Sequence, residues 1–175
     1  MRTLAWLALP ASVALAVGCL SPETSPARLQ TDSNEYLAVL QRADGPVRIL
    51  GFLVVAQFAN QGDTPLFLAR CYPGSPGPIF TVEVLETGDA WGAAYGAVWA
   101  CVGHDEQFLV QPGETRTDTL QLAGPHVYDG ITRQSRGALS GRMRLRYSVQ
   151  RCTGDGACLL REGIPSNVFS VGVGP

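Results

Sequence analysis

Residues 141–152, GRMRLRYSVQRC, contain the pattern that decides the fold. Large apolar residues alternate with polar ones along this stretch: Met143, Leu145, Tyr147 and Val149 form one set, and Arg142, Arg144, Arg146, Ser148 and Gln150 form the other. Successive side chains of a β-strand point to opposite faces of the sheet. The alternation therefore predicts an antiparallel strand with one face on the core and a basic face in solvent.

A second stretch, residues 47–60 (VRILGFLVVAQFAN), is apolar on both faces of the strand that it predicts. Such a strand is expected in the centre of its sheet. The turn residues 60–63, NQGD, then lead to a second apolar run at 64–71. This order predicts a β-hairpin with a four-residue connection.

Turn signals divide the rest of the chain into short segments. Residues 111–114, QPGE, have Pro and Gly where a type II turn requires them, and Gly88-Asp89 ends another run. Residues 35–42 fit a strand or a short helix, and the polar stretch 125–140 predicts a loop. Further strands are expected at 79–87, 107–110, 117–122 and 167–173. The chain is therefore predicted to be all-β, a single antiparallel sandwich of seven or eight strands.

Residues 91–102, WGAAYGAVWACV, place aromatic side chains at positions of one parity. If the whole stretch is a strand, Trp91, Tyr95, Trp99 and Cys101 lie on one face. An exposed stripe of this kind could stack on sugar rings, whereas a buried stripe would pack in the core. The small neighbours Ala94, Gly96 and Ala100 favour the core interpretation, and the sequence leaves the choice open.

The first nineteen residues predict export. Arg2 precedes an apolar run of fourteen residues from Leu4 to Val17, which suits a signal peptide and is too short for a membrane-spanning helix. Residues 15–19, LAVGC, resemble the lipobox of bacterial lipoproteins. That resemblance implies a lipidated Cys19 at the mature N-terminus, a cell-envelope location, and the outer membrane if the cell has one. The alternative is an ordinary signal cut near Ala16 or Gly18, with Cys19 incidental.

This N-terminus sets the expected domains. Residues 1–18 are the signal peptide, and residues 19–34, rich in Pro and Ser, predict a tether. The remaining residues, 35–175, predict one globular domain. We expect this domain to be a monomer.

The other four cysteines are expected to form disulfides, which persist in exported proteins. Four cysteines allow three pairings. We favour Cys71–Cys101 with Cys152–Cys158, because five turn-forming residues separate the second pair; crossed pairings remain the alternative. A metal site is the less favoured interpretation, because CTGDGAC lacks the usual C-x₂-C spacing and the chain has two histidines. No metal and no cofactor are expected.

The charge is uneven. The whole chain has a formal net charge of −2, yet residues 130–161 contain seven arginines and one acid, Asp155. The strand with Arg142, Arg144 and Arg146 is therefore a candidate anion-binding face, with Arg133, Arg136 and Arg151 nearby in sequence. The alternative is a solvated face whose arginines pair with Glu83, Glu86 or Asp118. We expect no nucleic-acid partner.

No pattern of catalytic chemistry is present: the sequence has no G-x-S-x-G, no H-E-x-x-H and no phosphate-binding glycine loop. His104-Asp105-Glu106 is expected to be solvated surface. The turns and strand patterns between residues 36 and 173 resemble the immunoglobulin-like domains of small bacterial lipoproteins. They are also distantly similar to the intracellular proteinase inhibitor family, through NQGD and PGET. The resemblance implies a non-enzymatic binding or structural module, and the alternative is an inhibitor of an envelope protease.

Overall fold

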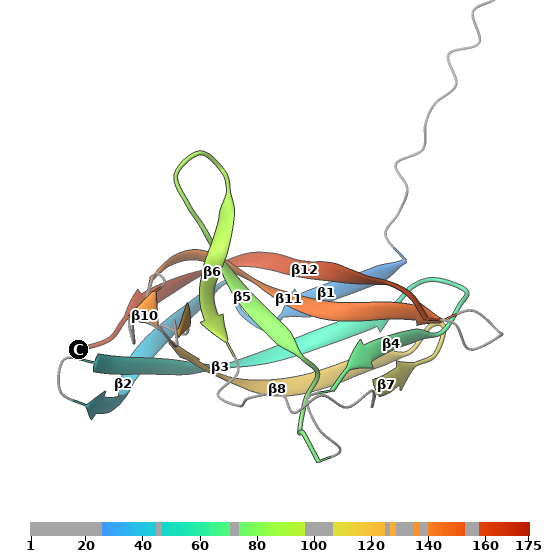
Figure 1. The fold of residues 1–175 in the computed structure, drawn as a ribbon, viewed down its shortest axis with the longest axis horizontal. Helices are drawn as coiled ribbons and strands as arrows, with labels where there is room; N and C mark the ends of the chain where they lie inside the picture. The colour runs from blue at the N-terminus through green and yellow to red at the C-terminus, as the bar shows by residue number, and fades with distance from the viewer. Residues whose placement is uncertain are drawn as a thin grey trace, which may run out of the picture.

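The fold is all-β, as predicted. A computed structural model describes residues 26–44, 47–70, 74–96, 107–124, 127–128, 135–136, 140–152 and 158–175 (Figure 1). These residues form strands and no helix, and none of them belongs to a helix that could span a membrane. The strands are β1 (Ala27–Thr31), β2 (Glu35–Asp44), β3 (Val47–Asn60), β4 (Leu66–Ala69), β5 (Phe80–Leu85), β6 (Trp91–Gly96), β7 (Gln107–Val110), β8 (Thr115–Gly124), β9 (Val127–Tyr128), β10 (Ser135–Arg136), β11 (Gly141–Cys152) and β12 (Cys158–Val173).

Two long strands, β3 and β11, organise the sheet. Strand β3 pairs with β1 and β2 on one edge and with β8 on the other. Strand β11 pairs with β12 along one edge, and with β5 and then β4 along the other. The two halves are joined by a parallel pairing of β12 with β2 and by β6, which lies between β5 and β8. Ten of the described strands thus form one curled mixed sheet, whereas a purely antiparallel sandwich of seven or eight strands was predicted.

The alternation in β11 is confirmed. Met143, Leu145, Tyr147 and Val149 are buried, whereas Arg142, Arg144, Arg146, Ser148 and Gln150 are exposed or partly exposed. The buried set packs against the inward residues of β3, which are Leu50, Phe52, Val54, Ala56 and Phe58. Aromatic rings join the two halves, because the ring centroids of Phe58 and Tyr147 are 6.1 Å apart. The core thus lies between β3 and β11.

Strand β3 is central, as predicted, but it is not buried on both faces. Leu53 is 62% exposed, and Val55 is partly exposed. The outward face of β3 is apolar in sequence and yet lies towards solvent. Composition alone therefore overestimated its burial.

The predicted hairpin of β3 with the following strand is wrong. Strand β4 pairs with β11 and β7 and therefore belongs to the other half of the sheet. The reason is Asn60, which is buried at the end of β3: its Nδ2 donates to the carbonyl oxygens of Thr64 at 2.8 Å and Val110 at 3.0 Å. These hydrogen bonds connect the turn after β3 to Val110 of β7, fifty residues later in the sequence. The chain therefore continues into the other half of the sheet.

The predicted tether is too long. Residues 27–31 form β1, which pairs with β3 in antiparallel register, and Ala27 and Leu29 are in the core. Two small or medium apolar side chains among polar neighbours were too weak a signal for a strand. Folded structure therefore begins before residue 35, and β2 is a strand, one of the two alternatives for residues 35–42.

The predicted turns are confirmed more fully than the predicted strand pairings. Gly113 has φ of 76°, and the Glu114 amide donates to the Gln111 carbonyl at 3.0 Å, which confirms the type II turn. Gly88 and Asp89 both have positive φ and close the β5–β6 hairpin, which stands away from the body (Figure 1). Strands β9 and β10 lie within the stretch predicted as loop and pair with each other.

Candidate anion-binding face

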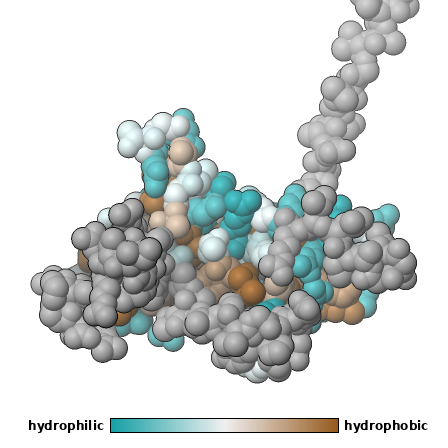
Figure 2. Space-filling view, in the orientation of Figure 1, coloured by the Kyte–Doolittle hydropathy of each residue, from teal (hydrophilic) through white to brown (hydrophobic). Residues whose placement is uncertain are grey.

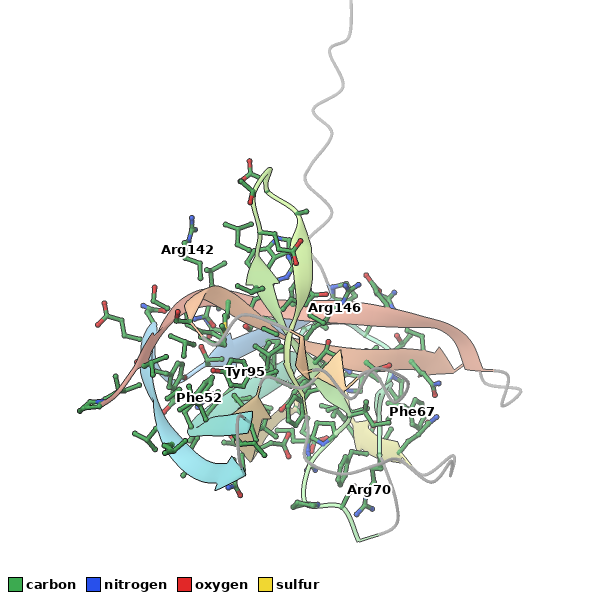
Figure 3. The ribbon with its side chains drawn as sticks, turned by 60° about the vertical axis from the view of Figure 1, so that its left-hand side comes forward. Phe52, Phe67, Arg70, Tyr95, Arg142 and Arg146 are labelled. Carbon is green, nitrogen blue, oxygen red and sulfur yellow. The ribbon has the colours of Figure 1, made fainter. Side chains whose placement is uncertain are left out.

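The three arginines of the predicted basic face lie on the outer side of β11. Strand β5 runs beside them, with Thr81 opposite Arg146 and Glu83 opposite Arg144. Arg142 projects outward near the β5–β6 hairpin, and Arg146 lies farther along the strand (Figure 3). The face is therefore built from two strands that are sixty residues apart in sequence.

One carboxylate is shared by two of these arginines. Arg144 Nε is 2.7 Å from Glu83 Oε2, and Arg146 Nη1 is 3.0 Å from Glu83 Oε1. The Arg144 guanidinium also lies over the Trp91 ring, 4.1 Å from its centroid. Cation–π contact and ion pairing together hold Arg144 in place. Glu83, one of the acids that the alternative interpretation named, therefore pairs with the face.

The face remains positive after this pairing. Three arginines and one glutamate leave a net charge of +2. Arg142 is exposed and makes no hydrogen bond or ion pair within the part of the chain that the structure describes. The Arg146 side chain is 42% exposed. Figure 2 shows hydrophilic residues gathered where β11 and β12 run.

The other arginines named from the sequence do not extend this face as a group. Arg151 is exposed and lies 3.7 Å from a carboxylate oxygen of Glu162. Arg133 lies outside the described residues, and Arg136 is described only by its backbone pairing in β10. The face is thus defined by Arg142, Arg144, Arg146, Glu83 and Trp91.

The outer side of the other sheet half differs in charge. The outward residues of β3 from Gly51 to Ala59, and those of β8 from Thr115 to Ala123, are all uncharged. A shallow cavity of about 490 Å³ lies over β2 and β3, with Leu37, Val39 and Leu53 among its lining residues. The outer sides of β3 and β8 are therefore uncharged within these two ranges, unlike those of β5 and β11.

The predicted aromatic stripe is broken. The pairing of β5 with β6 shifts by one residue, so that Val82 lies opposite Tyr95 and Leu85 opposite Trp91. This bulge puts Tyr95 on the inner face, where it is 3% exposed, and leaves Trp91 on the outer face. Burial raises the pKa of Tyr95 to about 12. Figure 3 shows Tyr95 beside Phe52, whereas Trp99 and Cys101 lie outside the described residues.

The cysteines are described in part. Cys152 and Cys158 lie directly opposite each other in the β11–β12 register. Directly opposed residues in antiparallel strands have Cα atoms about 4.5–5.5 Å apart, within the range of about 4.4–6.8 Å that disulfides require. Cys19, Cys71 and Cys101 lie outside the described residues, as does the cluster His104–Glu106. Within the described ranges, no group of three His, Cys, Asp or Glu residues could hold a metal.

Sequence reasoning missed a buried ion pair. Asp118 is 4% exposed and accepts two hydrogen bonds from Arg116, at 2.5 and 3.0 Å. The Tyr147 hydroxyl is 3.4 Å from the same carboxylate, and burial together with this charge raises the pKa of Tyr147 well above its ordinary value. The Arg116 guanidinium lies 3.6 Å from the centroid of the Phe108 ring. From the sequence, Asp118 was predicted only as a candidate partner for the arginines of β11.

Comparison with known proteins assigns no family. No family model matches the chain, and no curated protein matches it. Among solved structures, the Northeast Structural Genomics Consortium target SoR45 is 12% identical, with 83% of this chain and 85% of that chain covered and a TM-score of 0.42. The putative ApaA protein from Bordetella pertussis is 16% identical, with 84% and 91% covered and a TM-score of 0.40. These TM-scores are too low to support a statement about function.

Proposed function

We propose that this protein is a lipid-anchored, non-enzymatic module of the bacterial cell envelope, with an immunoglobulin-like domain that binds an anionic partner through the β11 face. The observation that carries the proposal is the row of Arg142, Arg144 and Arg146 with one compensating acid, Glu83. The partner class is a polyanionic glycan, an anionic lipid surface or an acidic protein. An inhibitor of an envelope protease is the alternative.

The geometry suits an extended anion. Alternate residues of a strand lie about 6.5–7 Å apart, so the three guanidinium groups form a ladder rather than a single point charge. Guanidinium groups bind carboxylate and phosphate in a bidentate manner. Glu83 holds two of the three in fixed positions, which lowers the conformational entropy that a partner's binding would cost.

The anchor and the disulfides are expected to be visible by mass spectrometry of the native protein. Intact mass of the membrane fraction should give a chain that starts at Cys19 and carries acyl groups, since one chain alone anchors only marginally. Non-reducing peptide mapping should give Cys71–Cys101 and Cys152–Cys158. A soluble chain that begins elsewhere, or a crossed pairing, would contradict this part of the proposal.

Binding is tested with the Arg142→Ser, Arg144→Ser and Arg146→Ser triple variant. Affinity for a polyanion such as dextran sulfate, measured by calorimetry, should fall at least tenfold in the variant and should weaken with salt in the wild type, because charge pairing at a surface is screened. Arg28→Ser is the matched control: Arg28 is exposed on β1 in the other sheet half, so its loss should change affinity little.

The same variants separate the candidate functions in a pull-down from solubilised envelope. An anionic component captured by wild type and lost in the triple variant supports the proposal. Equal capture by both proteins without salt dependence contradicts it. Capture and inhibition of a protease would favour the inhibitor alternative. Circular dichroism of the triple variant, and of a version that also carries Glu83→Gln, checks that removal of the arginines has not unfolded the sheet.

A further inference from the structure

The outer face of β11 is hollowed beside Arg146. The hollow has a volume of about 200 Å³, and its lining includes Thr81, Arg146, Ser148 and Gly163. One acid, Glu162, also lines it, and its carboxylate lies 3.7 Å from Arg151. Thr81 lies opposite Arg146 in the β5–β11 register, and Gly163 lies opposite Ser148 in the β11–β12 register. Three neighbouring strands therefore contribute to one small site at the end of the basic face.

Gly163 shapes this hollow. A Cβ atom at this position would overlap Arg146 Nε and would lie 2.5 Å from its Nη2. The guanidinium thus lies across the backbone of β12, in space that any other residue would fill. Its Nη1 donates to Glu83, while Nε and Nη2 are directed towards the glycine side of the hollow.

Two hydroxyl groups are available in the same place. Ser148 and Thr81 are at least partly exposed, and neither hydroxyl makes a hydrogen bond within the ranges that the structure describes. Hydroxyls can donate to an anion in any orientation that their rotation allows. The hollow therefore offers guanidinium N–H donors and two O–H donors that come from two strands.

We propose that Arg146, Ser148 and Thr81 form a pocket for a phosphoryl group carried by the anionic partner; this inference rests on the proposed function and specifies its ligand. A carboxylate presents two coplanar oxygens, which guanidinium groups can satisfy without further donors, as Arg144 and Arg146 do at Glu83. A phosphoryl group presents three or more oxygens in a tetrahedron. Donors on a guanidinium and on two separate hydroxyls match that larger number of acceptors.

The test uses variants that keep every charge. Thr81→Val with Ser148→Ala removes both hydroxyls, and Gly163→Val puts a side chain where the Arg146 guanidinium lies and so displaces it from the hollow. Inorganic phosphate is titrated into ¹⁵N-labelled protein at constant ionic strength, and backbone shifts are followed by NMR. We expect wild type to bind phosphate more tightly than acetate, and each variant to bind phosphate about tenfold more weakly. Vesicles of phosphatidylcholine with phosphatidic acid, compared with phosphatidylcholine alone, show whether a lipid phosphate is accepted as well as the free ion.

The outcomes separate this pocket from the proposed function. The pocket is overturned if the hydroxyl variant binds phosphate as tightly as wild type, or if wild type binds acetate as tightly as phosphate. Either result leaves the proposed function standing as long as the triple arginine variant binds dextran sulfate more weakly than wild type. If wild type binds no polyanion at all, the proposed function fails and the pocket fails with it. The NMR spectrum of the Thr81→Val, Ser148→Ala variant, compared with that of wild type, checks that its fold is intact. Thr119→Val, on the uncharged outer side of β8, is the matched control.

Discussion

Replacement of Asp118 by Ala is expected to destabilise the protein by about 3–5 kcal/mol, the usual cost of removing one partner from a buried ion pair. Asp118 is 4% exposed and accepts two hydrogen bonds from Arg116. Without the carboxylate, the Arg116 side chain, which is 25% exposed, would keep a charge with no counter-ion in a largely buried site. The Tyr147 hydroxyl, 3.4 Å from the carboxylate, would lose its acceptor as well.

Urea denaturation measures this loss as a shift of the unfolding midpoint. Thr119→Ala is the matched control, because Thr119 is the next residue on β8 and is exposed, and its change should stay within about 0.5 kcal/mol. The double variant Arg116→Ala with Asp118→Ala should recover part of the loss, since it leaves no unpaired charge. An Asp118→Ala protein as stable as the control would mean that the ion pair contributes little.

Local patterns in the sequence predicted local structure well. The alternation in β11 gave the buried and exposed sides of that strand, because the side-chain period of a strand is two and leaves little freedom. The turn at residues 111–114 was equally readable, since a positive φ at Gly113 is what its position in a type II turn requires. The three arginines of the candidate face were found from this alternation alone.

Pairing over long distances was harder to predict. The run NQGD has the composition of a hairpin turn, and nothing in it reveals that the Asn60 amide would be buried against Val110. The short strand β1 was hidden by its polar neighbours, although Leu29 is in the core. In β6 a single bulge moved Tyr95 to the face opposite Trp91. The first two features depend on a partner strand that is distant in sequence, and the third depends on a register shift within the β5–β6 hairpin.

The contacts that stabilise the candidate face were also predicted only in part. The sequence offered Glu83, Glu86 and Asp118 as equal partners for the arginines. Register decided among them: Glu83 lies opposite Arg144 on the outer face, whereas Asp118 lies opposite Ala56 on the inner face. The face of the sheet on which each side chain lies could be predicted from the alternation within its strand. Which strand lies next to it could not.

Alanine substitutions at Gly124 and Gly51 provide a second test, because we expect them to change the stability of the protein very differently. Both are buried glycines at the β3–β8 pairing, where Gly124 faces inward opposite Leu50 and Gly51 faces outward opposite Ala123. A Cβ atom at Gly124 would lie 2.7 Å from Tyr95 Cε1 and 2.9 Å from its Cγ. Tyr95 is itself buried, with 3% of its surface exposed. A Cβ at Gly51 would meet only the end of the exposed Gln41 side chain, which can move away.

Gly124→Ala is therefore expected to lower the free energy of unfolding by about 1–3 kcal/mol, because the Tyr95 ring is packed in the core and must be displaced. Gly51→Ala should be neutral or stabilising by up to about 1 kcal/mol, since alanine loses less backbone entropy than glycine in a strand. Thermal or urea denaturation of the two variants compares them directly. Tyr95→Leu in the Gly124→Ala background should return part of the loss, because the smaller side chain leaves room for the new methyl group. Equal stability of Gly124→Ala and Gly51→Ala would show that β6 does not pack against β8 in this way.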